Sequence, residues 1–235
     1  MNGPALLALQ LIDSELDQID GRRKRLAERV ALNEAKAAHT RWIAERDRLL
    51  AVASSAGTSI EQAEAAGADL AKKQAKLEAQ LKTVIAPREA EALMNEIGIL
   101  VARRGELDDA ELVAMEEQAE AETALEALHA IEPTLLAAID DASAALDDAL
   151  GALAADESDV RVRRSEVDAS LTGSERDLYA SARSRHGGIG VSRLERHTCT
   201  GCHVDLSQVE FERVRAAALA GELPECPHCA RFLVV

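Results

Sequence analysis

Apolar residues recur at alternating spacings of three and four along much of this chain, and the repeat predicts two long helices. The first run extends from about residue 4 to residue 86. Its seam positions are Leu9, Ile12, Leu16, Ile19, Leu26 and Val30, and then Leu70, Leu77, Leu81 and Val84. A heptad pattern of this kind is typical of a helix that packs along one stripe against another helix.

The heptad pattern is weaker in the middle of this first run. Gly and Ser between Val52 and Ser59 lower helix propensity. We therefore expect one long helix that bends or unwinds near Gly57, with two separate helices as the alternative.

A second run begins at Pro87, a residue well suited to the first turn of a helix. Its seam positions share one heptad register: Leu93, Ile97, Leu100, Leu107, Ala114, Ala121, Leu125, Leu128, Leu135, Ile139, Ala142, Leu146, Ala149 and Leu153. Pro133 lies inside the run and is expected to kink the helix, because proline removes a backbone donor and crowds the preceding turn.

Two such helices joined by a tight connection are expected to form an antiparallel hairpin with its turn near residues 86–88. In that register Leu49 faces Leu125 and Leu77 faces Ile97. The basic cluster at residues 22–25 then comes near Asp147 and Asp148, so its charge is matched within the chain. The fold class is mainly α, a long antiparallel coiled-coil hairpin over residues 1–170 followed by a small domain over residues 171–235.

All the cysteines of the chain lie in that small domain, as two C-x-x-C pairs: Cys199 and Cys202, then Cys226 and Cys229. Two such turns can place four thiolates tetrahedrally around Zn²⁺. Because four thiolates leave no open coordination position, this zinc would be structural. The residues between the pairs, 207–220, predict a short helix that ends at Gly221.

Pairs of cysteines also occur in disulfides, redox sites and iron–sulfur centres. A disulfide pair needs an oxidising compartment, and a redox C-x-x-C is expected beside a βαβ pattern; the sequence favours neither. An iron–sulfur centre also uses four thiolates, so it stays open. His197, His203 and His228 lie nearby and are expected outside the ligand set.

Composition narrows the class of protein. The chain of 235 residues has a formal charge of −15 and only four aromatic residues. The short apolar run after Pro4 has neither the flanking positive charge of a signal peptide nor the length of a membrane span. We therefore expect a cytoplasmic protein with no membrane association.

The domain at residues 171–235 differs from the rest in charge, since it holds eight Arg against eight Asp and Glu. Ser174 is expected to cap a short helix there, and residues 191–197 and 231–235 read as two strands that the zinc joins. A basic cluster in this domain is a candidate contact for nucleic acid: Arg183, Arg185, Arg193 and Arg196.

Two motifs resemble a bacterial family that combines a helical hairpin with a C-terminal four-cysteine zinc ribbon. The hairpin turn matches P-R-E-x-x-A-L-x-x-E-I at residues 87–97, and the ribbon matches C-x-G-C and C-P-x-C with Arg231 and Phe232 after it. Two positions depart from the family pattern: Ala230 replaces a usual Gly and Ala90 a usual aromatic. The resemblance implies a nucleic-acid-binding role, in some members the regulation of flagellar gene expression.

No catalytic constellation accompanies these motifs, so we expect a protein that is not an enzyme. One hypothesis is a regulator that binds RNA or DNA through the ribbon. The other is an adaptor or chaperone-like scaffold that binds partner proteins through the helical hairpin. The sequence leaves the oligomeric state and the identity of any partner open.

Overall fold

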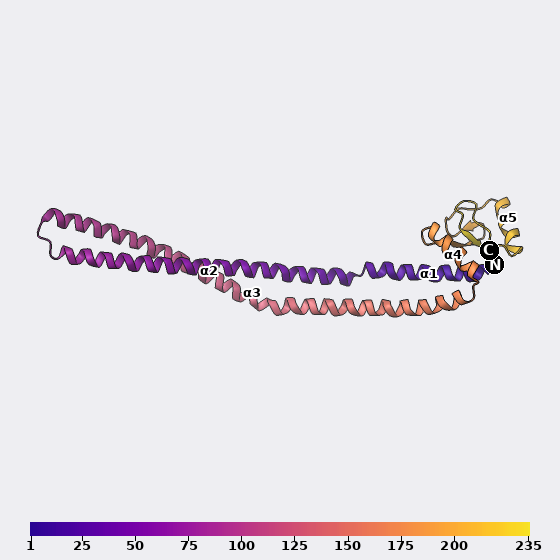
Figure 1. Cartoon of the computed structure of the whole chain (residues 1–235), viewed down its shortest axis with the longest axis horizontal. Coiled ribbons are helices and arrows are strands. Elements are labelled where there is room, and N and C mark those ends of the chain that lie inside the picture. The colour runs from indigo at the N-terminus through magenta and orange to yellow at the C-terminus, as the bar shows by residue number, and fades with distance from the viewer. The chain divides into compact units, whose positions relative to one another are not determined.

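A computed structural model describes all 235 residues. The helices are α1 (Gly3–Lys24), α2 (Ala27–Leu81), α3 (Pro87–Ala169), α4 (Gly173–Arg185) and α5 (Gln208–Leu219), and the strands are β1 (Val191–Glu195), β2 (Thr198–Cys199) and β3 (Phe232–Val234). The predicted class, a long helical hairpin with a small C-terminal sheet region, is confirmed (Figure 1).

The chain forms two compact units. One contains Met1–Val30 together with Ser143–Val235, and the other contains Ala31–Ala142. The first therefore holds α1, the end of α3, α4 and the whole cysteine region. The predicted division at residue 170 stays a prediction about which part can fold by itself. None of the helices is long and apolar enough to cross a lipid bilayer.

In the unit Ala31–Ala142, α2 and α3 run back along each other from the connection at residues 82–86 (Figure 1). Leu49 and Leu125 are both buried, as the predicted register requires. Trp42 is also buried, and its indole Nε1 donates a hydrogen bond to the Leu128 carbonyl at 2.8 Å. The kink predicted at Pro133 does not interrupt α3.

The unwinding expected near Gly57, and the alternative of two helices divided there, are wrong, because α2 is continuous at this point. The Thr58 and Ser59 hydroxyls donate to carbonyls one turn earlier, at 3.0 and 3.1 Å. The small side chain of Ala56 is buried, and a Cβ at Gly57 would lie 3.8 Å from Gln118 on α3. Ala56 is therefore a packing position, and the polar residues beside it bond back onto the helix rather than end it.

The interruption lies instead at Arg25 and Leu26, between α1 and α2. Arg25 Nε donates to the Gly21 carbonyl at 3.1 Å, and Arg29 Nε donates to the Arg23 carbonyl at 3.2 Å. Basic side chains at a helix C-terminus satisfy its free carbonyls and favour its dipole. The run of positive charge therefore ends α1.

The basic cluster pairs with other carboxylates than those predicted. Arg22 lies 3.9 Å from Asp156, and Arg23 pairs with Glu157, rather than with Asp147 and Asp148. In the predicted register Arg22 faces residue 152, which lies one turn from both Asp148 and Asp156, and the structure pairs Arg22 with Asp156. The structure nevertheless shows arginines of the basic cluster paired with carboxylates of the same chain.

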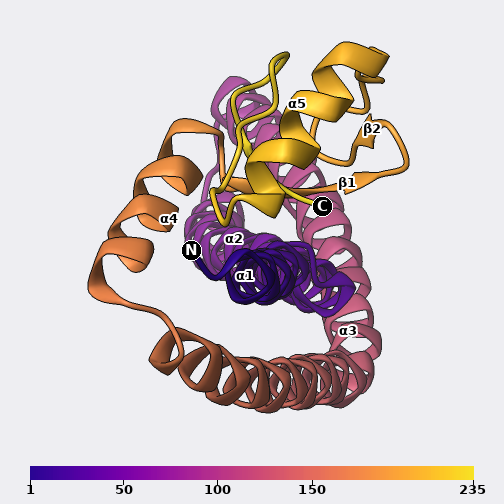
Figure 2. The ribbon, with the colours of Figure 1, turned by 90° about the vertical axis from the view of Figure 1, so that its right-hand side faces the viewer.

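The sheet has the order β2-β1-β3, with β1 antiparallel to β2 and parallel to β3. Leu6 and Leu9 of α1 pack in one core with Tyr179 of α4, Val191 of β1 and Phe232 of β3. Figure 2 shows α4 and the strands arranged around the start of α1. The first helix thus belongs to the same hydrophobic core as the last strand.

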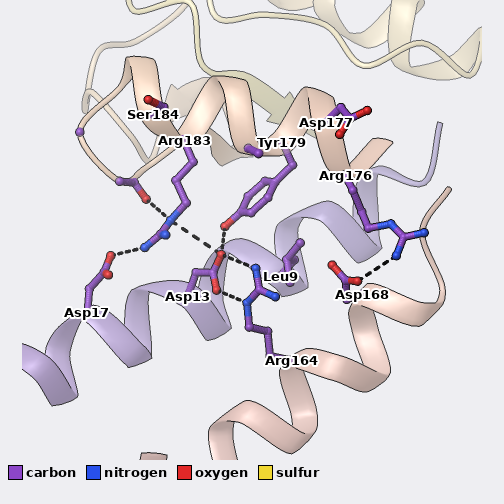
Figure 3. Close-up of a pocket in the computed structure, with 13 residues that line it drawn as sticks. Leu9, Asp13, Asp17, Arg164, Asp168, Arg176, Asp177, Tyr179, Arg183 and Ser184 are labelled. Carbon is purple, nitrogen blue, oxygen red and sulfur yellow. Dashed lines mark hydrogen bonds and ion pairs between the residues drawn. The ribbon is translucent and has the colours of Figure 1, made fainter. Parts of the chain in front are cut away.

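A buried carboxylate joins three helices beside this core (Figure 3). Asp13 of α1 is only 3% exposed; it accepts hydrogen bonds from Arg164 Nε of α3 and from the Tyr179 hydroxyl of α4, each at 2.7 Å. Arg183 Nε lies 3.7 Å from the same carboxylate. Burial and the hydrogen bond to Asp13 raise the pKa of Tyr179, which keeps the phenol protonated as a donor.

We expect Asp13→Ala to lower the free energy of unfolding by about 3 kcal/mol, because it leaves arginine charge and a phenol without their acceptor. The matched control is Asp17→Ala, one turn along α1, whose exposed carboxylate also pairs with Arg183 and should matter by less than about 1 kcal/mol. Urea unfolding followed by circular dichroism measures both. Equal losses for the two variants would contradict a central role for Asp13.

Candidate metal centre

The four cysteine sulfurs converge, as the sequence predicted. All four Sγ atoms lie within 4.8 Å of one another. Cys199 and Cys229 are 4.0 Å apart at sulfur, and Cys202 and Cys226 are 3.9 Å apart. A tetrahedral Zn²⁺ with bonds of ~2.3 Å places its sulfurs about 3.8 Å apart. The donor set and its spacing fit structural Zn²⁺ held by four thiolates.

The two cysteine turns are built alike. In the first, Cys199 N donates to the Val204 carbonyl at 3.1 Å, and His203 N donates to the Cys199 carbonyl at 2.8 Å. In the second, Cys226 N donates to the Arg231 carbonyl and Ala230 N donates to the Cys226 carbonyl, both at 2.8 Å. The same pattern of backbone hydrogen bonds thus positions the two cysteine sulfurs in each turn.

Both turns require a left-handed residue immediately after the second cysteine. His203 and Ala230 each have a φ of 57° there. A side chain at positive φ crowds the following carbonyl, so glycine is the easiest residue at this point. The family pattern has glycine at the second of these positions, and the structure supplies the reason.

The thiols differ in how readily they ionise without metal. Burial raises the pKa of Cys226 to about 12 and also raises the pKa of Cys202. Burial acts in the same direction on Cys229, but donors from the Arg231 backbone and side chain, and from neighbouring thiols, outweigh it and lower its pKa to about 7. Zinc binding must therefore displace protons from the buried thiols, so zinc affinity should fall in acid.

The nearby histidines lie outside the cluster of metal-binding atoms, which consists of the cysteines alone. The His197 ring packs on Phe211 with centroids 4.2 Å apart. His228 Nε2 lies 3.8 Å from Glu210, and His203 is exposed.

The helix expected between the cysteine pairs is α5. Ser207 caps it in a reciprocal box with Glu210, and Gly221 follows its end with a φ of 80°. Val214 of α5 packs in one cluster with Cys199 and Cys226. The helix therefore covers the metal site with apolar side chains.

Sequence reasoning placed the cap of α4 at the wrong residue. Thr172, not Ser174, is the N-cap, and Glu175 completes a capping box with it. Backbone donors from Thr172 and Asn2, and then the Thr172 hydroxyl, lower the pKa of Glu175 to about 2. The bond from Asn2, at 2.7 Å, ties the start of α1 to the start of α4.

The candidate nucleic-acid residues do not share one environment. Arg183 donates to Asp17 and to the Gly188 carbonyl, so this side chain holds α4 to α1. Arg193 is exposed and lies 3.8 Å from Glu195. Arg185 and Arg196 are exposed. Three of the four therefore remain accessible to a ligand, and Arg183 has a structural role.

Arg231 has a role that the sequence reasoning missed. Its Nε donates to the Ile189 carbonyl at 2.9 Å, and its Nη1 donates to the Gly201 carbonyl at 3.2 Å. It follows the second cysteine turn and reaches back to the first. The sequence offered one signal for this role, because the family motif places an arginine shortly after the last cysteine.

A cavity of about 690 Å³ lies between α1, the end of α3 and α4. Figure 3 shows the arginines that line it directed at carboxylates. Arg164 pairs with Asp13, Arg176 with Asp168, and Arg183 with both Asp13 and Asp17. The charged groups that line this cavity form ion pairs with one another. The cavity is therefore a junction between helices.

We expect Cys226→Ser, or chelation of zinc, to unfold the sheet and α5 while most of the helical signal persists, because a structural metal site contributes its binding energy to local folding. Far-ultraviolet circular dichroism measures the helix, and limited proteolysis measures the C-terminal region. If the helical signal falls to the same extent as the C-terminal region unfolds, the hairpin over residues 1–170 does not fold separately.

We also expect Ala230→Gly to stabilise the zinc-loaded protein by about 1 kcal/mol, since glycine removes the penalty of a left-handed residue. The matched control is Ala220→Gly, at the end of α5 with a φ of −75°, where glycine brings no such relief. Thermal unfolding in the presence of zinc compares them, and a gain at both positions or at neither would contradict this account of the turn.

Comparison with known proteins agrees with this architecture. Residues 9–187 match the family described as the CT398-like coiled coil hairpin domain, and residues 198–233 match the C4-type zinc ribbon domain. An uncharacterized Mycobacterium tuberculosis protein, Rv2229c, is 28% identical over 234 residues, covering 98% of this chain and 94% of the relative.

Solved structures share the fold. CT398 from Chlamydia trachomatis has a TM-score of 0.79 at 20% identity, covering 98% of this chain and 95% of CT398. A Mycobacterium smegmatis protein has a TM-score of 0.71 at 25% identity, covering 99% and 97%. HP0958 from Helicobacter pylori has a TM-score of 0.57 at 17% identity, covering 99% and 96%. With the hairpin and the four-cysteine site both matched, this chain belongs to the CT398-like family of coiled-coil hairpin proteins that carry a C4-type zinc ribbon.

Proposed function

We propose that this protein is a non-enzymatic, cytoplasmic adaptor that binds a partner protein beside its zinc ribbon. The observation that carries the proposal is an apolar groove between α1 and the sheet. Two adjoining hollows of about 330 and 280 Å³ form it, and they share Leu7, Leu11 and Arg193. A reduced compartment suits the zinc-binding thiols.

The walls of the groove are largely apolar at the end nearer the chain termini. Pro4, Leu7, Ala8 and Leu11 of α1 face Leu194, Val234 and Val235 across it. Leu11 and Val235 are each 57% exposed, and Ile189 in the adjoining hollow is 41% exposed. Exposed apolar side chains gathered at a groove are typical of a binding surface rather than of general solvent exposure.

The chemistry of the groove favours an amphipathic partner helix with an acidic residue on its apolar flank. Helix-in-groove recognition uses apolar anchors along one face of the bound helix. Arg193 stands in the wall of both hollows, held only loosely at 3.8 Å from the exposed Glu195. A partner carboxylate could replace Glu195 at that guanidinium.

A second candidate function is binding of RNA or DNA through the ribbon. It is favoured by the exposure of Arg185, Arg193 and Arg196 in a domain without net charge. It is weakened by the engagement of Arg183 with carboxylates and by the formal charge of −15 on the whole chain, which repels phosphates.

We expect a photocrosslinking amino acid at position 11 to capture a discrete protein in cells, and the adduct to be lost when Arg193→Glu is added. The matched control places the same group at Leu219 on α5, which is 81% exposed but lies outside the groove. The same adducts from both positions, or none from position 11, would contradict the adaptor proposal.

A second assay distinguishes nucleic-acid binding from the adaptor function. Labelled single- and double-stranded RNA and DNA are titrated with zinc-loaded protein across a salt series. The adaptor proposal expects no tight, salt-sensitive binding. Such binding, lost in Arg193→Glu/Arg196→Glu but kept in a matched Arg213→Glu/Arg215→Glu protein, would establish the nucleic-acid function instead, and its salt slope would count the phosphates neutralised.

A further inference from the structure

A second apolar seam lies on the outside of α3 in the unit Ala31–Ala142. We call it the outer stripe, and its positions are Met94, Gly98, Val101, Gly105, Asp108, Leu112, Met115 and Ala119. The four large apolar side chains of the outer stripe are 50–58% exposed. A Cβ added at Gly98 or Gly105 would meet nothing within 4 Å, so the surface beside them is open.

The outer stripe repeats with the period of a coiled coil. Its positions alternate by four and three residues, so they fall on one face of the helix. The face differs from the hairpin seam, whose members Leu93, Ile97, Leu100 and Leu107 are half-buried. At ~1.5 Å per residue the stripe runs for about 39 Å. A seam of this length with no partner in its own chain is suited to another helix.

The stripe is complementary to itself when two copies run antiparallel. If Val101 faces Leu112 of a second copy, Met94 faces Ala119 and Met115 faces Gly98. Each Met thus meets a small residue, as interdigitated packing requires. Gly105 faces Asp108, which leaves room for the carboxylate to reach solvent. Twofold symmetry repeats every one of these pairs.

Charge selects the same register. Arg104 and Glu111 lie seven residues apart along the same flank of the stripe, and Arg104 is exposed. The antiparallel register that pairs Val101 with Leu112 brings Arg104 of each copy beside Glu111 of the other. A parallel pairing would instead set Asp108 against Asp108 and Gly98 against Gly98, which combines repulsion with a void.

From these features we infer that the outer stripe binds a second copy of this chain, giving an antiparallel twofold dimer through α3. The interface is isologous and therefore closes at two copies. The formal charge of −15 on each copy opposes association. Screening by salt weakens that repulsion, so the dimer strengthens as salt is raised, in contrast to nucleic-acid binding.

Sedimentation equilibrium of the full-length, zinc-loaded chain at high salt tests the inference. The wild type is expected to dimerise with rising concentration. Val101→Glu is expected to raise the dissociation constant at least about tenfold, because it places a carboxylate in two apolar layers of the dimer. The matched control is Val113→Glu, on the same helix and 56% exposed but outside the stripe, which should dimerise like the wild type.

A charge exchange tests the orientation. Arg104→Glu and Glu111→Arg should each weaken the dimer, and the double variant should restore it, with circular dichroism showing unchanged helix content. A wild type that stays monomeric at every concentration and salt overturns the inference, as does equal behaviour of Val101→Glu and Val113→Glu. Failure of the double variant to recover the dimer overturns the antiparallel register.

Discussion

A buried carboxylate on α1 joins three helices at the zinc-bearing end of the molecule. Asp13 on α1 accepts from Arg164 on α3 and from Tyr179 on α4, and Arg183 lies nearby. A carboxylate removed from water is costly unless such partners surround it. Because these partners come from different helices, the arrangement is satisfied only when all three helices are in place. The groove beside the sheet depends on that placement, since α1 forms one of its walls.

Features with a local or periodic signature were predictable. The two heptad seams predicted the long helices, the paired C-x-x-C motifs predicted the metal ligands, and residues 207–220 predicted the helix between them. The middle of the hairpin also followed, because the register set by one turn places Leu49 opposite Leu125, and both are buried. In each case the information lies within a few helical turns or in the chemistry of one residue type.

Features that depend on distant partners were not predictable in the same way. The break at Arg25 came from side chains that turn back onto carbonyls. At Gly57 the helix continues instead, with Ala56 buried and the Thr58 and Ser59 hydroxyls bonded to carbonyls one turn earlier. From the sequence, Arg183 is interpreted as a surface arginine that could contact nucleic acid. In the fold it lies beside Asp13 and Asp17. Glu175 gained its partner at Asn2 only through folding. Neither spacing nor a motif marks these particular side-chain pairs in the sequence.

The shared core of the first helix and the last strand has a consequence for how the chain is made. Leu6 packs in the same cluster as Phe232, so α1 leaves the ribosome long before its core exists. At about 5–20 residues per second, the wait is on the order of tens of seconds. During that time α1 exposes the leucines that later contact β1 and β3. The C-terminal residues therefore complete the folding of the N-terminus, and a truncated product would leave those leucines uncovered for association with other chains.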